Sequence, residues 1–71
     1  KGGNMSCIVN AANEVVNAGF RRGECGILQM GDIIEQVMAK ANFDSQPDLD
    51  VYLQTDAEAR RIAAELMKSA S

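Results

Sequence analysis

The sequence predicts an all-α fold, a small helical bundle of about three main helices plus one short helical segment. Apolar residues recur at steps of three and four along three stretches of the chain, which is the period of one helix face. Asparagine, aspartate, threonine, glycine and proline, which favour the starts and ends of helices, stand between these stretches. No repeat, low-complexity tract or linker divides the 71 residues, so we expect one domain over residues 1–71.

The first helix is expected from Met5 to Phe20. Asn4 is a favourable N-cap, because its side-chain oxygen can accept hydrogen bonds from backbone N–H groups of the first turn. Arg21 and Arg22 suit the negative end of the helix dipole, and Gly23 suits the left-handed position that ends a helix. The apolar stripe of this helix consists of Ile8, Ala11, Ala12, Val15 and Gly19, widened by Cys7 and Ala18.

The opposite face of this helix is polar, because Asn10, Asn13, Glu14 and Asn17 are also spaced three and four residues apart. Asparagine is a mediocre helix former, so three of them on one face need an explanation. One interpretation is a solvated face. The other is a polar seam whose side-chain amides hydrogen-bond a neighbouring element. The sequence leaves both open.

The segment Glu24–Met30 is too short to predict a helix. We expect an extended connection that holds its apolar side chains under the domain, namely Ile27, Leu28 and Met30. A second helix then begins at Gly31 or Asp32, where the carboxylate suits the first turn, and ends at Ala41. Its stripe consists of Ile33, Ile34, Val37, Met38 and Ala41.

A loop is expected over Asn42–Gln46, with Phe43 turned back onto the core. Pro47 fits the first turn of a short helical segment that ends at Leu53. This segment is expected to turn three apolar side chains inward, those of Leu49, Tyr52 and Leu53.

The last helix is the clearest feature of the sequence. Thr55-Asp56-Ala57-Glu58 has the pattern of a capping box, in which the Thr55 hydroxyl and the Glu58 carboxylate accept from each other's backbone N–H groups. The outer side carries two i,i+4 pairs, Asp56–Arg60 and Arg61–Glu65. The apolar stripe consists of Ala59, Ile62, Ala63, Leu66, Met67 and Ala70.

Composition excludes several classes of function. The chain has no histidine, which excludes Ser-His and Cys-His nucleophile pairs and histidine-ligated metals. The net charge of −3, with basic residues paired only at Arg21-Arg22 and Arg60-Arg61, gives no footprint for nucleic acid, and both pairs are interpreted as surface charges. No apolar run is long enough to cross a membrane. Cys7 and Cys25 are interpreted as reduced thiols of a cytoplasmic protein, Cys7 packed as a small hydrophobe and Cys25 on a loop. The alternative is a disulfide between them.

No catalytic, cofactor-binding or metal-binding residue is predicted. Glu14 is the one carboxylate among polar neighbours on a helix, and nothing in the sequence supplies the partner that a general acid or base needs. Gly2-Gly3 lacks the spacing of a phosphate loop. The aspartates around Pro47 lack the spacing of an EF-hand. The serines have no base to activate them, namely Ser6, Ser45, Ser69 and Ser71.

One run of residues resembles a known family. Gly2-Gly3 followed by Asn10-Ala11-Ala12-Asn13-Glu14 is similar to the start of the C-terminal domain of 1-deoxy-D-xylulose 5-phosphate reductoisomerases. The likeness continues, in the same order, through Gly26-Ile27-Leu28-Gln29-Met30, Asp32-Ile33-Ile34-Glu35 and Thr55-Asp56-Ala57-Glu58-Ala59-Arg60. The chain departs from the family pattern at Ser6, at Val16-Asn17 and at Gly19.

The resemblance implies a role within a larger enzyme. Members of this family rearrange and reduce a pentulose phosphate with NADPH and a divalent metal, Mg or Mn, for isoprenoid synthesis by the methylerythritol phosphate pathway. Their cofactor and metal sites belong to other domains, so the resemblance assigns none of those residues to this chain. It implies a fragment of a longer chain that supports the catalytic domain without being catalytic. The alternative is a non-enzymatic helical module that binds another protein.

The resemblance also implies that the family bundle contains a helix before Gly2-Gly3. A bundle without that helix exposes parts of its apolar stripes, and two copies can cover them about a two-fold axis. We therefore expect a dimer or higher assembly of this chain, with Ile33, Val37, Ile62 and Leu66 near the contact.

Overall fold

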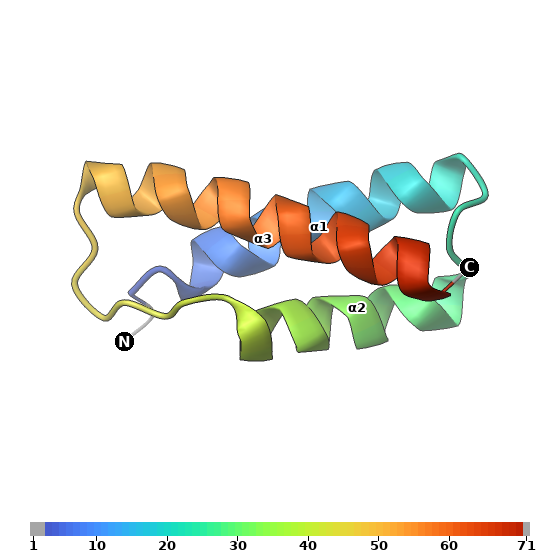
Figure 1. Cartoon of the computed structure of the whole chain (residues 1–71), viewed down its shortest axis with the longest axis horizontal. Coiled ribbons are helices and arrows are strands. Elements are labelled where there is room, and N and C mark those ends of the chain that lie inside the picture. The colour runs from blue at the N-terminus through green and yellow to red at the C-terminus, as the bar shows by residue number, and fades with distance from the viewer. Residues whose placement is uncertain (1–2, 71) are drawn as a thin grey trace.

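The computed structural model describes residues 3–70, which form three α-helices and no strand. They are α1 (Met5–Arg21), α2 (Ile27–Lys40) and α3 (Leu49–Ala70). Figure 1 shows the three helices side by side, with α1 and α3 running in one direction and α2 in the other. Each helix packs against both of the others. The predicted all-α bundle is confirmed.

The core lies along the common axis of the three helices. Ile8 and Val16 of α1 and Val37 of α2 are fully buried, and α3 contributes Ala59 and Ala63, also at 0% exposure. Small residues let the helices approach closely, because a Cβ atom added to Gly19 would overlap the sulfur of Met67. The predicted stripe of α1 is confirmed except at one position, where Val16 is buried in place of Val15.

The end of α1 follows the prediction from Gly23. Gly23 has φ +79°, in the left-handed region that favours glycine. Its N–H donates to the Phe20 carbonyl at 3.0 Å, and the N–H of Glu24 donates to the Gly19 carbonyl at 2.8 Å. This pair of bonds is a Schellman motif, which satisfies carbonyls that the helix would otherwise leave without partners.

The start of α2 was predicted wrongly. The helix begins at Ile27, so the extended connection expected over Glu24–Met30 is only Glu24 to Gly26. Gly26 is extended, and its N–H donates to Gln29 Oε1 at 2.7 Å, which supports the first turn. The side chains of Ile27 and Leu28 are 70% and 87% exposed instead of packed under the domain.

The start of α3 was also predicted wrongly. The short segment from Pro47 and the last helix are one continuous helix from Leu49. Its cap is Asp48, whose Oδ1 accepts a 2.9 Å hydrogen bond from the N–H of Val51. Thr55 therefore lies inside the helix and caps nothing. The loop expected over Asn42–Gln46 and both i,i+4 ion pairs of the last helix are confirmed.

Four apolar side chains near this helix start were expected inside and are exposed. In Figure 1 the first turns of α3 extend beyond the ends of α1 and α2, so the neighbouring helices leave part of their surface uncovered. The exposed fractions are 50% for Phe43, 71% for Leu49, 40% for Tyr52 and 62% for Leu53.

The residues expected at a contact between copies lie in the bundle itself. Ile33, Val37 and Ile62 are between 0% and 7% exposed, and Leu66 is half-buried against the same core. Because the three helices cover one another's stripes, the side chains of Ile33, Val37 and Ile62 are not available for a contact between copies. That part of the prediction was wrong.

Candidate functional site

The most enclosed polar group of the structure is the side chain of Asn4. Its Nδ2 donates to Thr55 Oγ1 at 2.8 Å and to the Asn42 carbonyl at 2.9 Å. Its Oδ1 accepts from the N–H of Asp44 at 2.8 Å. Asn4 is 0% exposed and Thr55 is 4% exposed. We call this group of four residues the Asn4 clasp.

The Asn4 clasp ties three separate parts of the chain together. It joins the start of α1, the loop between α2 and α3, and the second turn of α3. The backbone N–H of Asn4 adds a 3.0 Å bond to the carbonyl of Asp44. A buried amide is costly unless its donors and acceptors are paired, and here they are paired.

The Asn4 clasp also corrects two sequence predictions. Asn4 stands at the N-cap position of α1, but its side chain makes no capping bond. Thr55 and Glu58 are not a capping box: the hydroxyl of Thr55 accepts from Asn4, and Glu58 Oε1 accepts from the N–H of Asn42 at 2.9 Å. Asn4 and Glu58 bind the loop instead, and Thr55 binds Asn4, because these parts of the chain meet in the fold.

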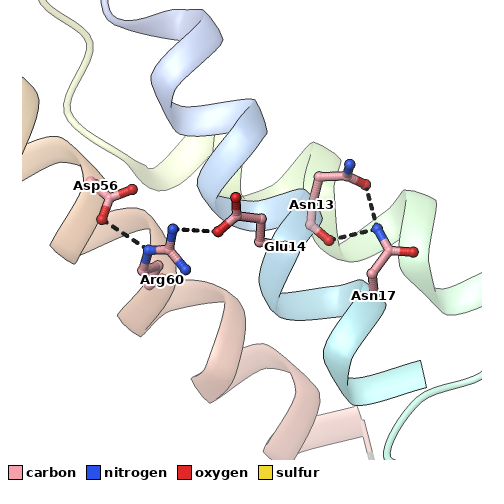
Figure 2. A network of polar contacts seen from close by, with 5 residues as sticks. All are labelled: Asn13, Glu14, Asn17, Asp56 and Arg60. Atoms are coloured by element: carbon pink, nitrogen blue, oxygen red, sulfur yellow. Dashed lines mark hydrogen bonds and ion pairs between the residues drawn. The ribbon is translucent and has the colours of Figure 1, made fainter. Parts of the chain in front are cut away.

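A second polar group links α1 to α3 at the surface. Figure 2 shows Arg60 between two carboxylates, with Nη2 2.6 Å from Glu14 Oε1 and Nε 2.8 Å from Asp56 Oδ2. The hydrogen bond to Asp56, and then the one to Glu14, raise the pKa of the Arg60 guanidinium. Glu14 thus has a partner that the sequence did not indicate, and this partner is a permanent cation rather than an acid or base.

The asparagines of α1 form no seam with another helix. Asn17 Nδ2 donates to the carbonyl of Asn13 at 2.8 Å and to Asn13 Oδ1 at 3.0 Å, both within α1 (Figure 2). Asn10 is exposed. Of the two interpretations, the solvated face is therefore the correct one for these amides, and Glu14 alone carries the contact across to α3.

The two cysteines are free thiols, as expected. Cys7 is half-buried, with Sγ 3.6 Å from the Tyr52 carbonyl, and burial followed by the nearby Asp56 charge raises its pKa. Cys25 lies on the loop after α1 but is buried, with Sγ 3.6 Å from the Val16 carbonyl. A raised pKa keeps Cys7 in the thiol form, which is a poor nucleophile.

Charged side chains line two hollows on the surface of the described residues. One lies beside the Asn4 clasp, and its carboxylates already accept from backbone N–H groups, Glu58 from Asn42 and Asp44 from Gln46. The other lies between the later turns of α1 and α3, where Arg22 is paired with Glu24 at 2.8 Å. Ser6, Ser45 and Ser69 are exposed, while Ser71 lies outside the described residues.

The described side chains do not fit a metal site. Over residues 3–70, no three histidine, cysteine, aspartate or glutamate side chains gather closely enough to hold a metal ion. No helix within that range is long and apolar enough to span a membrane. The fold and its contacts thus define a class: a small all-helical domain whose polar side chains join its own elements.

Comparison with known proteins gives the family. The sequence profile described as DXP reductoisomerase C-terminal domain matches residues 1–62, and the chain belongs to this family. It is 60% identical over 67 residues to the 1-deoxy-D-xylulose 5-phosphate reductoisomerase of Bacteroides thetaiotaomicron, and 58% identical over 67 residues to that of Bacteroides fragilis. Each alignment covers 94% of this chain and 17% of the relative.

More distant relatives carry the same name. The reductoisomerase of Listeria monocytogenes is 38% identical over 66 residues, which cover 93% of this chain and 17% of that protein. No solved structure matches the chain significantly. The chain is the C-terminal domain of a reductoisomerase of this family, and it spans about one sixth of the length of these relatives.

Proposed function

We propose that this chain is the non-catalytic helical domain of an NADPH-dependent 1-deoxy-D-xylulose 5-phosphate reductoisomerase, where it supports the catalytic domain. The observation that carries the proposal is the family match over residues 1–62 together with the internal use of the polar side chains. Asn4, Thr55, Glu58 and Arg60 are each engaged by another part of the same domain. These contacts stabilise the fold of the domain itself.

The chemistry of the reaction is assigned to the rest of the enzyme. Residues 3–70 hold no group of three histidine, cysteine, aspartate or glutamate side chains that could bind the divalent metal, Mg or Mn, and the family resemblance assigns NADPH to other parts of the enzyme. We therefore derive no chemical step from this chain and place both groups in the preceding domains. The proposed location of the enzyme is the cytoplasm, where isoprenoid precursors of this kind would be made.

The test is a domain exchange. The matching segment of the Bacteroides thetaiotaomicron reductoisomerase is replaced by this chain, which is 60% identical to it. We expect NADPH-dependent turnover within about threefold of the parent enzyme and an unchanged KM for NADPH, because the exchange leaves the catalytic groups in place.

A matched variant tests the non-catalytic part of the proposal. Glu14→Gln in the exchanged enzyme removes the one carboxylate that the sequence singled out, and it should leave the pH profile of kcat unchanged. A chimera that unfolds cooperatively but has no turnover would contradict the proposed role. A displaced pH profile in Glu14→Gln would contradict the absence of catalytic groups.

A further inference from the structure

The first turns of α3 present apolar side chains to solvent at one end of the bundle. Leu49, Tyr52 and Leu53 are spaced i, i+3 and i+4, so they lie on one face of the helix. They are 71%, 40% and 62% exposed, and the loop at the same end adds Phe43 at 50%. We call these four residues the overhang patch. Grouped exposed apolar residues of this kind mark interaction sites in soluble proteins.

The helix that carries the overhang patch is held firmly. Asp48 caps its first turn through the N–H of Val51, and the Tyr52 carbonyl lies 3.6 Å from Cys7 Sγ of α1. Thr55, one turn further on, belongs to the Asn4 clasp. A fixed surface loses little conformational entropy when it binds, which favours docking.

The segment of sequence that carries the overhang patch has charges of one sign only. Between Lys40 and Arg60 the sequence contains no basic residue, while it contains five acidic ones: Asp44, Asp48, Asp50, Asp56 and Glu58. Asp48 and Asp50 are exposed beside Leu49. Charge complementarity therefore calls for an apolar surface bordered by lysine or arginine.

The end of the domain at which the polypeptide enters identifies the partner that covers the overhang patch. The backbone of Gly3 packs so tightly on the loop that a Cβ atom there would overlap the Asp44 carbonyl and lie 2.8 Å from Ser45 Cα. Gly3 therefore lies at the overhang end of the domain, where Figure 1 also shows the start of α1. This domain is C-terminal in its family and spans 17% of the relatives, so most of their length precedes it.

We propose that the overhang patch docks against the polypeptide that precedes this domain in the reductoisomerase, on an apolar surface bordered by basic side chains. The inference rests on the proposed function, and it adds which face makes the contact. A surface joined to its partner at the same end of the domain meets it at a high effective concentration, so a modest patch is sufficient. The exposed pair Ile27 and Leu28 lies at the start of α2, at the other end of the bundle from the overhang patch, and is not part of the contact.

The test measures access to thiols placed in the full-length enzyme that carries this chain as its C-terminal domain. Leu53→Cys reports the overhang patch, and Leu28→Cys is the matched control, because both positions are exposed leucines within the first five residues of a helix. Alkylation by iodoacetamide is followed by mass spectrometry of the separate peptides. We expect Leu53→Cys to react at least tenfold more slowly than Leu28→Cys. Equal rates would overturn the proposal.

A second variant tests the charge complementarity. Asp50→Lys should raise the alkylation rate of Leu53→Cys several-fold, whereas Asp32→Lys, at an exposed position of α2, should leave it unchanged. An unchanged alkylation rate in Asp50→Lys would overturn the inference that basic side chains border the partner surface. Protection of Leu53→Cys that disappears on dilution would overturn the assigned occupant, because it would indicate a second copy of the chain.

Turnover separates this inference from the proposed function. An exchanged enzyme that is active but leaves Leu53→Cys as reactive as Leu28→Cys would retain the function and reject the docking face. An inactive exchanged enzyme in which Leu53→Cys is protected would reject the function and retain the docking face.

Discussion

The side-chain amide of Asn4 donates a 2.8 Å hydrogen bond to the hydroxyl of Thr55, 51 residues further along the chain. This bond is buried, and it closes the end of the bundle at which the chain enters. It explains why an asparagine before a helix and a threonine within another helix are both placed away from solvent.

Asn4→Ala should lower the free energy of unfolding by about 2–4 kcal/mol, because it leaves Thr55, the Asn42 carbonyl and the Asp44 N–H without a partner. The measurement is urea unfolding followed by circular dichroism. Asn10→Ala, at an exposed position of the same helix, is the control and should change stability by less than about 0.5 kcal/mol. Equal effects of the two substitutions would contradict the Asn4 clasp.

A double-mutant cycle tests the bond itself. Asn4→Ala and Thr55→Val should be non-additive, with a coupling energy of about 1 kcal/mol or more, because the residues share one buried hydrogen bond. If Thr55 were a helix cap, its loss would be independent of Asn4 and the two effects would add. Additive effects within error would therefore favour the interpretation of Thr55 as a helix cap.

Two glycine substitutions should change the stability of the domain in opposite directions. Gly31 lies inside α2 with open space around it, so Gly31→Ala should stabilise the domain by about 0.5–1 kcal/mol. Gly23 has φ +79°, so Gly23→Ala should destabilise it by about 1 kcal/mol. Thermal unfolding of both variants checks this. A destabilising Gly31→Ala would indicate that α2 begins after residue 31.

The rate at which Cys7 is alkylated should rise with pH, with its midpoint at a higher pH than for a free thiol. Burial and the Asp56 charge raise its pKa, so the rate should reach half its maximum at a higher pH than for glutathione in the same buffer. A raised thiol pKa stabilises the fold below the pKa of the unfolded chain, and this contribution is lost as pH rises through the folded pKa. Stability should thus fall at alkaline pH, and by less in Cys7→Ala. A half-maximal pH at or below that of glutathione would contradict the raised pKa.

The sequence predicted what depends on local pattern. The apolar stripes, the end of α1 at Gly23 and the pairs Asp56–Arg60 and Arg61–Glu65 are set within a few residues, and the structure confirms them. The family was also readable, because its motif around Asn10 to Glu14 is continuous.

The errors arose where distant parts of the chain decide the outcome. Thr55 and Glu58 have the spacing of a capping box, but Asn4 engages Thr55 and the loop after α2 engages Glu58. The helix extends back through both residues to a cap at Asp48. Leu49 and Leu53 follow the apolar period, yet α3 extends beyond its neighbours and no element covers them. Apolar residues at helical spacing predict which face of a helix is apolar, but they do not predict how far the adjacent helix extends.

The central claim, that this domain supports an enzyme without taking part in its chemistry, is tested most directly by Asn4→Ala in the full-length reductoisomerase. We measure kcat/KM at 20 °C and the temperature of irreversible inactivation, beside the thermal midpoint of the domain. The account predicts an unchanged kcat/KM at 20 °C and an inactivation temperature that falls together with the midpoint. A loss of kcat/KM at 20 °C, with the domain still folded by circular dichroism, would contradict it.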